Sequence, residues 1–449
     1  MGLLEQADKH RANSPMTEAA PNAGDARKSI AHASLTDVGL RRGSNQDSLA
    51  VALAADDADW RRRGHLFMVA DGMGAHAAGE LASKIACESM PHTYRKSLDR
   101  SPAEALRHAV VTANASIHTR GQANAEFQGM GTTCCALVLL PRQAIVAHVG
   151  DSRVYRLRGG KFEQLTFDHS LVWEMMAAGQ MPKGDVANFI PKNIITRSLG
   201  PHADVQVDLE GPLALEPGDT FLLCSDGLSG QVKDEELSEL LGALSPSEAV
   251  RTLVDVANLR GGPDNITAIV VRVEAVPAGD ANDVALAEPE KASPVSPFWW
   301  GLMALALLVA LVLAVARYYA GALISVLVGA ASGVAALLQG LSRPQSAPQT
   351  AQQGPYGKGP YATFDCLPNA EAVQSAAQLA AQLREATRNE HWTLDWAHFN
   401  GLCEAANRAA SNGDFRSAVR NYALAISFIM NEIRNQKKTD QRDKSVLDM

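Results

Sequence analysis

The sequence predicts an α+β fold built on antiparallel strands, and two observations carry this prediction. Short β-branched or apolar runs, typical of strands, lie at residues 65–70, 132–140, 144–149, 220–224 and 266–273. Pro141-Arg142-Gln143 separates two of these runs, as a hairpin turn would. Helix starts lie between the groups, because Ser101 and Ser245 are each followed by Pro and then by Glu, a capping box. Strands grouped in hairpins favour an antiparallel arrangement over a parallel βαβ sheet.

Composition excludes several classes of protein. The chain has 449 residues and a formal net charge of -8, which argues against nucleic acid as the main partner. Its six cysteines form no C-x-x-C pair, so we expect neither a zinc site nor a disulfide framework. The first thirty residues lack a continuous apolar core, so we expect no signal peptide and a cytoplasmic N-terminal domain.

Shifts in composition divide the chain into eight segments. They are a flexible N-terminal arm (1–29), a globular domain (30–276), a linker (277–297), a transmembrane helix (298–316), a second transmembrane helix (320–339), a second linker (340–368), a helical tail (369–435) and a charged C-terminus (436–449).

Two uncharged or nearly uncharged segments predict membrane insertion. Residues 298–316 carry no charge and are long enough to span a bilayer, with Trp300 and Tyr318 near the two interfaces. Residues 320–339 are rich in Gly and Ala and contain a small-xxx-small pattern that lets helices pack closely. We expect a helical hairpin with both ends in the cytoplasm, and therefore an inner-membrane location. A buried soluble helix is the alternative for the first segment.

The tail is predicted to be helical. Residues 402–429 are similar to one tetratricopeptide helix-turn-helix unit, with small residues where paired helices touch. A simple helical hairpin explains the same pattern, because one such unit cannot bury a solenoid core. Either structure suggests a surface that docks a protein partner.

Four aspartates follow apolar strand-like runs in turns that contain Gly, namely Asp71, Asp151, Asp226 and Asp264. One such Asp is usually only a turn residue. If the strand ends converge, however, the four carboxylates form an anionic cluster that repels itself unless cations neutralise it. Oxygen ligands select hard cations, so the pattern predicts a Mg²⁺ or Mn²⁺ site.

An arginine lies close to another carboxylate in the segment Arg42 to Asp47. Such a pair is more often a surface ion pair than a substrate clamp. A guanidinium can nevertheless bind phosphate oxygens in a bidentate way. An arginine beside carboxylates that hold divalent cations suits the hydrolysis of phosphoesters.

Residues 34–273 resemble the metal-dependent protein phosphatases (PPM, or protein phosphatase 2C, type) in their bacterial serine/threonine branch. Seven ordered motifs carry the resemblance: Gly39-x-x-Arg42-x-x-Asn45-Gln46-Asp47, Ala70-Asp71-Gly72-Met73-Gly74, Gly129-Met130-Gly131-Thr132-Thr133, Val149-Gly150-Asp151-Ser152-Arg153, Thr166-x-Asp168-His169-Ser170, Ser225-Asp226-Gly227-Leu228 and Asp264-Asn265-x-Thr267. The resemblance implies an α-β-β-α sandwich, in which helices flank two antiparallel sheets.

The resemblance also implies a set of metal ligands for two or three divalent cations, Mn²⁺ or Mg²⁺. Asp71 would bridge two of them, and the carbonyl of Gly72 would bind one. Asp226 and Asp264 would bind the other, and Asp151 together with Asp226 matches the positions of a third, weaker ion.

Further roles are implied for residues around these ligands. Arg42 matches the phosphate-binding arginine, Asp47 would hydrogen-bond metal-bound water, and Asn265 would brace the turn that presents Asp264. Met73 replaces a proposed general-acid histidine of eukaryotic members, and His76 is an alternative that a structural or surface histidine would explain equally well. The implied nucleophile is a hydroxide that bridges two metals, without a phosphoenzyme.

The expected function is therefore a membrane-anchored phosphatase that acts on phosphoserine and phosphothreonine in proteins, opposite a serine/threonine kinase. Two alternatives stay open. One is a pseudophosphatase scaffold that binds phosphoproteins, although the presence of all four aspartates favours the enzyme. The other is a phosphatase dedicated to one partner-switching regulator, with the tail as its specificity device.

Overall fold

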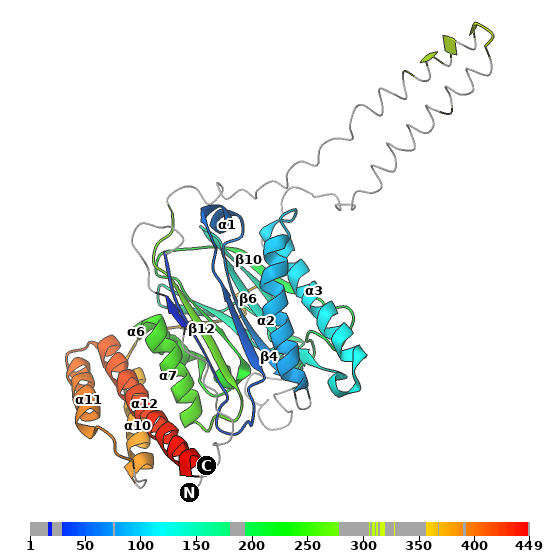
Figure 1. Ribbon diagram of the computed structural model, residues 1–449. Helices are drawn as coiled ribbons and strands as arrows, with labels where there is room; N and C mark the ends of the chain where they lie inside the picture. Colours follow the sequence, from blue (N-terminus) through cyan, green and yellow to red (C-terminus); the bar gives the residue numbers. More distant parts are fainter. Residues whose placement is uncertain are drawn as a thin grey trace. The chain divides into compact units, whose positions relative to one another are not determined.

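Two antiparallel sheets lie face to face at the centre of the fold (Figure 1). The computed structural model describes residues 17–19, 29–74, 77–179, 194–277, 356–366, 368–388 and 392–447, with isolated positions between 305 and 327. The first sheet has the order β1-β2-β12-β11-β8-β9-β13: Thr17–Ala19, Ile30–Asp37, Ile266–Val273, Thr220–Cys224, Arg153–Arg158, Lys161–Gln164 and Ala362–Asp365. The second has the order β10-β7-β6-β4-β3, with β5 paired to β4: Asp208–Ala214, Gln143–Val149, Cys134–Leu139, His65–Met73, Asp47–Ala52 and, for β5, Gly131–Thr132.

The space between the sheets is filled by alternate residues of each strand. In β11, Phe221 and Leu223 enter this inner core, whereas Leu222 and Cys224 face the helices on the other side. Successive side chains of a strand point to opposite faces, so a strand with a hydrophobic layer on both sides is apolar throughout. This is why the sequence of β11 is a continuous apolar run rather than an alternating one.

Helices cover the outer face of both sheets. Helices α2 (Ala78–Lys96) and α3 (Pro102–Ala123) share a core with the second sheet, and α6 (Asp234–Ala243) and α7 (Pro246–Leu259) share one with the first. Shorter helices are α1 (Asp57–Arg62), α4 (Leu171–Ala177), α5 (Asp226–Ser229) and the 3₁₀ turn Ala125–Phe127. The predicted α-β-β-α sandwich is confirmed.

The predicted helix starts are also present. Ser101 Oγ accepts a hydrogen bond from the backbone N–H of Glu104 at 3.3 Å. At Ser245 the capping box is complete, because the backbone N–H of Ser245 also donates to the carboxylate of Glu248 at 2.9 Å. These bonds satisfy N–H groups that the first turn of a helix leaves without partners.

Three C-terminal helices form a further layer outside α6 and α7. They are α10 (Ala370–Arg388), α11 (Trp396–Ser411) and α12 (Phe415–Leu447), and α12 contacts both α6 and α7. Buried apolar residues of α12 continue the core that α6 and α7 share with the first sheet. A buried ion pair joins Arg434 of α12 to Asp255 of α7. The tail is therefore packed on the sandwich.

Two strands lie in segments that we expected to be irregular. Strand β1 falls within the N-terminal arm and pairs with β2, and β13 falls within the linker 340–368 and pairs with β9. Both add to the edges of the first sheet, where a strand has unpaired N–H and C=O groups that recruit even a short segment. Helix α12 also runs on into the charged C-terminus, to Leu447.

The chain separates into two compact units, residues 1–285 with 355–449, and residues 286–354. The predicted membrane segments 298–316 and 320–339 lie mostly outside the described residues. Among the residues that the structure describes, none of the helices combines the length and the apolar character needed to cross a bilayer.

Candidate functional site

Acidic residues from both sheets meet at one end of the sandwich. Asp47 at the start of β3 lies directly opposite Asp71 near the end of β4 in the strand register. Asp226 begins α5 immediately after β11, and Asp264 precedes β12. A Cβ at Gly227 would overlap the carbonyl oxygen of Asn265, so only glycine allows the turn after β11 and the loop before β12 to come this close.

Asp151 comes from the turn between β7 and β8. The turn needs Gly150, whose φ of 113° lies in the region that favours glycine. Gly150 and His169 exchange hydrogen bonds, since the N–H of Gly150 donates to His169 Nδ1 at 3.0 Å and the N–H of His169 donates to the carbonyl of Gly150 at 2.8 Å. His169 Nε2 in turn contacts Asp208 Oδ2 at 2.9 Å. The turn that presents Asp151 is therefore held from the side of the β9–α4 loop.

The carboxylates act on each other as one cluster. Burial, together with the charges of Asp47, Asp226, Asp151 and Asp264, raises the pKa of Asp71 well above its ordinary value. Burial and the charges of Asp226 and Asp264 outweigh two hydroxyl hydrogen bonds and raise the pKa of Asp47 to about 7. Burial and the charge of Asp226 raise the pKa of Asp151 to about 8. The carboxyl groups therefore disfavour one another's ionisation unless positive charge is supplied.

The two carboxylate oxygens of Asp47 differ in their hydrogen bonding. Its Oδ2 accepts hydrogen bonds from Ser225 Oγ and Thr267 Oγ1, both at 2.7 Å. Its Oδ1 is buried and has no hydrogen-bond partner among the residues that the structure describes. Sequence reasoning assigned no role to Ser225 and Thr267, although both stand in quoted motifs beside Asp226 and Asn265.

Open carboxylate oxygens are what a divalent cation requires. Within the described part of the chain, Oδ1 of Asp151 and Oδ1 of Asp226 are likewise buried without a hydrogen-bond partner. A buried carboxylate oxygen without a partner is costly, and hard cations such as Mg²⁺ and Mn²⁺ prefer oxygen donors. The donor set therefore fits divalent cations by its chemistry.

The geometry of a closed metal site is not present. No three His, Cys, Asp or Glu side chains stand in coordinating positions anywhere in the described ranges. Arg42 Nη2 binds Asp264 Oδ2 at 2.7 Å and so provides positive charge to the acidic cluster. The role of Arg42 in binding phosphate stays a prediction.

Asn265 connects the segment that carries Arg42 to the loop that carries Asp264. Its Oδ1 accepts a hydrogen bond from the backbone N–H of Gln46 at 2.8 Å, and its Nδ2 donates to the carbonyls of Val38 and Ser44. Gly72 is also tied to this segment, because its N–H donates to the carbonyl of Gln46 at 3.1 Å. His76, the alternative general acid, lies outside the described residues.

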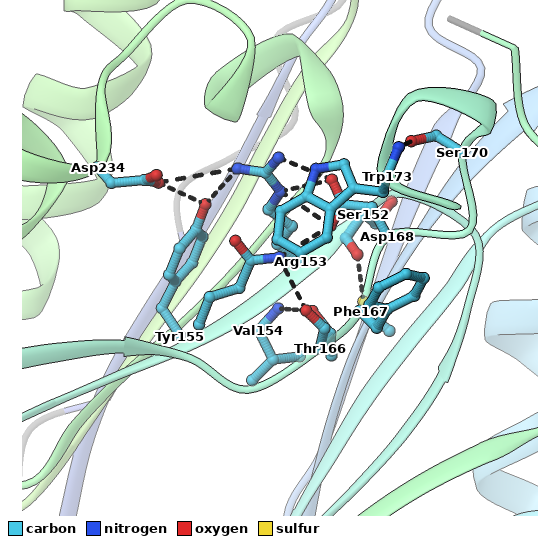
Figure 2. A network of polar contacts seen from close by, with 12 residues as sticks. Ser152, Arg153, Val154, Tyr155, Thr166, Phe167, Asp168, Ser170, Trp173 and Asp234 are labelled. Atoms are coloured by element: carbon cyan, nitrogen blue, oxygen red, sulfur yellow. Dashed lines mark hydrogen bonds and ion pairs between the residues drawn. The ribbon is translucent and has the colours of Figure 1, made fainter. Parts of the chain in front are cut away.

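A polar network is centred on Arg153, two residues after Asp151 (Figure 2). Arg153 Nε and Nη2 bind the carboxylate of Asp168 at 2.7–3.0 Å, and Nη1 binds the hydroxyl of Tyr155 at 2.8 Å. The guanidinium also lies 5.5 Å from the ring centre of Trp173 in α4. Arg153 and Asp168 belong to quoted motifs, but only the structure shows that they join the Asp151 turn to α4.

The fold and the clustered carboxylates together define an α-β-β-α sandwich protein with an acidic site between its two sheets. The sequence pattern of the family described as "Protein phosphatase 2C" matches residues 41–258. The chain is similar to protein phosphatase PhpP of Streptococcus pneumoniae, with 39% identity over 242 residues, 53% of this chain and 95% of the relative. It is similar to serine/threonine phosphatase stp of Listeria monocytogenes, with 36% identity over 241 residues, 53% of this chain and 93% of the relative.

Among solved structures, the chain is similar to the serine/threonine phosphatase PstP/Ppp of Mycobacterium tuberculosis. The identity is 32% and the TM-score is 0.49, with 55% of this chain and 99% of that chain covered. By its sequence relatives, the chain belongs to the protein phosphatase 2C family, in its bacterial branch, and is a protein serine/threonine phosphatase.

Proposed function

We propose that this chain is a divalent-metal-dependent phosphatase, anchored in a membrane, that removes phosphate from serine and threonine residues of proteins. The observation that carries the metal dependence is the set of three buried carboxylate oxygens without partners, on Asp47, Asp151 and Asp226, among the described residues. When bound, divalent cations would lower the pKa of a coordinated water and offset the charge of the phosphoryl oxygens.

The chain's own residues would bind the cations and accept a proton from water. Asp71, Asp226, Asp264 and Asp151, with the carbonyl of Gly72, would hold the cations. Asp47 keeps Oδ2 fixed by two hydroxyl groups, so its Oδ1 is available to orient and accept a proton from water.

Arg42 is the residue that would bind the phosphoryl group of the substrate. Its side chain is 48% exposed, so it reaches both solvent and the carboxylate of Asp264. Arg42 binds Asp264 through Nη2 alone, and a guanidinium can bind phosphate oxygens in a bidentate way. The physiological substrate is then a phosphoprotein, opposite a serine/threonine kinase.

A phosphatase assay on a phosphothreonine peptide tests the metal dependence. We expect activity of the full chain with Mn²⁺ and its loss in chelator. Asp226→Asn should lower kcat/KM by about a hundredfold or more, because it removes a charged ligand. Asp99→Asn is the matched control, since Asp99 is an exposed carboxylate remote from the cluster. Full activity in chelator, or equal activity of the two variants, would overturn the proposal.

Two observations support the membrane anchor. Segment 298–316 is uncharged, and the residues before and after the hydrophobic region belong to the same compact unit. Strand β12 before this segment and Tyr356 after it belong to the same compact unit, and the backbone of Tyr356 bonds to that of Gly211. Strand β13 and helix α12 then pack on the same unit. Both ends of the intervening segment must therefore lie on one side of any membrane it enters, which favours a hairpin over a single span.

An epitope tag after the last residue tests this topology. We expect the tag to be protected from protease in spheroplasts and removed in inverted vesicles, as should be a second tag before residue 1. Extraction at alkaline pH should leave the protein in the membrane fraction. Opposite accessibility of the two tags would exclude the hairpin, and release at alkaline pH would exclude the anchor.

A further inference from the structure

The segment that follows the hydrophobic region is bonded to the sandwich along its whole described length. We call residues 356–366 the connector. Besides the backbone bonds of Tyr356, the carboxylate of Glu210 accepts hydrogen bonds from Tyr361 Oη at 2.6 Å and from the N–H of Gly359 at 3.1 Å. Gly357 has a φ of 78°, in the region that favours glycine, and its Cα lies against this carboxylate. The connector is therefore a fitted part of the sandwich rather than a tether.

Tyr361 of the connector contacts the loop between β9 and α4. Its ring lies 5.5 Å from that of Phe167, at an interplanar angle of 64°. Phe167 in turn meets Trp173 of α4 edge to face, at 5.4 Å and 88°. Trp173 lies against the guanidinium of Arg153 (Figure 2). These aromatic contacts form a continuous path from the connector to α4 and Arg153.

The same loop holds the Asp151 turn on both sides. Asp168, which follows Phe167, binds Arg153, two residues after Asp151. His169 binds the backbone of Gly150, one residue before Asp151. A shift of Phe167 therefore moves both groups that fix the position of Asp151.

We propose that Tyr361 is a positioning residue for the phosphatase site, acting through Phe167 on the Asp151 turn and on helix α4. The inference rests on the proposed function, because it takes Asp151 to be part of the metal centre. The connector lies outside residues 41–258, which the family pattern matches. The connector, which follows the hydrophobic region in the sequence, would thus set the geometry of the site within residues 41–258.

The test compares three variants of the full chain. Tyr361→Ala removes the ring from Phe167, and Tyr361→Phe keeps the ring but loses the hydrogen bond to Glu210. Phe364→Ala is the matched control, because Phe364 is an aromatic residue of the same connector that packs against the outer helices instead. For each variant, kcat, KM for a phosphothreonine peptide, the Mn²⁺ concentration for half-maximal activity and Tm are measured.

We expect Tyr361→Ala to raise the half-maximal Mn²⁺ concentration and to lower kcat/KM by on the order of tenfold, since small displacements of a catalytic group have large effects on rate. Tyr361→Phe should retain wild-type kinetics. Phe364→Ala should lower Tm with little change in kinetics.

Wild-type kinetics in Tyr361→Ala, or equal kinetic losses in Tyr361→Ala and Phe364→Ala, would overturn the inference. If Tyr361→Ala does not fold, Phe167→Leu replaces it, because it breaks the aromatic path and leaves the connector intact. Phe167→Leu should then show the same kinetic losses, and wild-type kinetics in that variant would refute the inference. Inactivity of the wild-type chain with Mn²⁺ is a separate outcome, which would instead reject the proposed function.

Discussion

Replacing Arg434 by Met should uncouple the C-terminal helices from the sandwich. Arg434 is 7% exposed and its partner Asp255 is 0% exposed, so the variant leaves a buried carboxylate without its main counter-charge. Breaking a buried ion pair on one side costs about 3–5 kcal/mol of unfolding free energy. Replacing both residues by apolar ones, in Asp255→Leu with Arg434→Met, should recover stability to within about 1 kcal/mol of the wild type.

The assay is urea unfolding of the full chain, followed by tryptophan fluorescence. Trp392 and Trp396 report on the tail, and Trp60 and Trp173 report on the sandwich. Arg420→Met is the matched control from the same helix, because Arg420 is 51% exposed where it pairs with Glu248 and should cost less than about 1 kcal/mol. Equal losses in Arg434→Met and Arg420→Met would refute the idea that a buried pair fastens the tail.

Three further predictions concern protons and backbone space. The raised pKa values of Asp47 and Asp151, about 7 and about 8, mean that Mn²⁺ binding at pH 6 should release on the order of two protons per chain. The affinity for Mn²⁺ should therefore fall as the pH falls. Calorimetry in two buffers measures the proton release, and binding without proton release would contradict the prediction. Burial and nearby glutamates raise the pKa of Glu239 from 4.5 to about 7. Between pH 4.5 and about 7 the folded state therefore binds more protons than the unfolded state, and its stability falls as the pH rises through this range. Glu239→Gln should therefore have a higher Tm than wild type at pH 8 but not at pH 4.5, and an equal Tm at pH 8 would contradict the shift. Gly227→Ala should lower Mn²⁺-dependent activity by on the order of tenfold or more, because its methyl group must push Asn265 and its loop away; unchanged kcat/KM would show that the close approach is dispensable.

Local patterns in the sequence predicted an antiparallel α+β fold, and the family resemblance implied the α-β-β-α sandwich. The acidic cluster was predicted because each of four Asp residues follows an apolar run in a turn with Gly. Only the structure shows that Asp47 lies opposite Asp71 in the strand register. The partners of Asp47 could not be predicted, because Ser225, just after β11, and Thr267, in β12, reach it from the side of the other sheet.

The docking of the tail was not predicted, since its contacts join residues far apart in sequence. Strand β13 is only four residues long, and its alternation of apolar and polar residues is too short to identify β9 as its partner. Asp255 and Arg434 each resemble ordinary surface charges of a helix. Only the structure shows that buried residues lie on most sides of α7, as expected for a helix covered by protein on two faces.

The outer helical layer is the last part of its unit to be synthesised. Helix α7 is complete at Leu259, whereas the residues of α12 that cover it, such as Ile429, follow roughly 170 residues later. At about 5–20 residues per second, the ribosome leaves α6 and α7 uncovered for on the order of ten to thirty seconds. Their outer apolar surface is accessible to neighbouring nascent chains throughout this interval. The yield of folded protein should therefore depend on elongation speed and chaperone supply after residue 277.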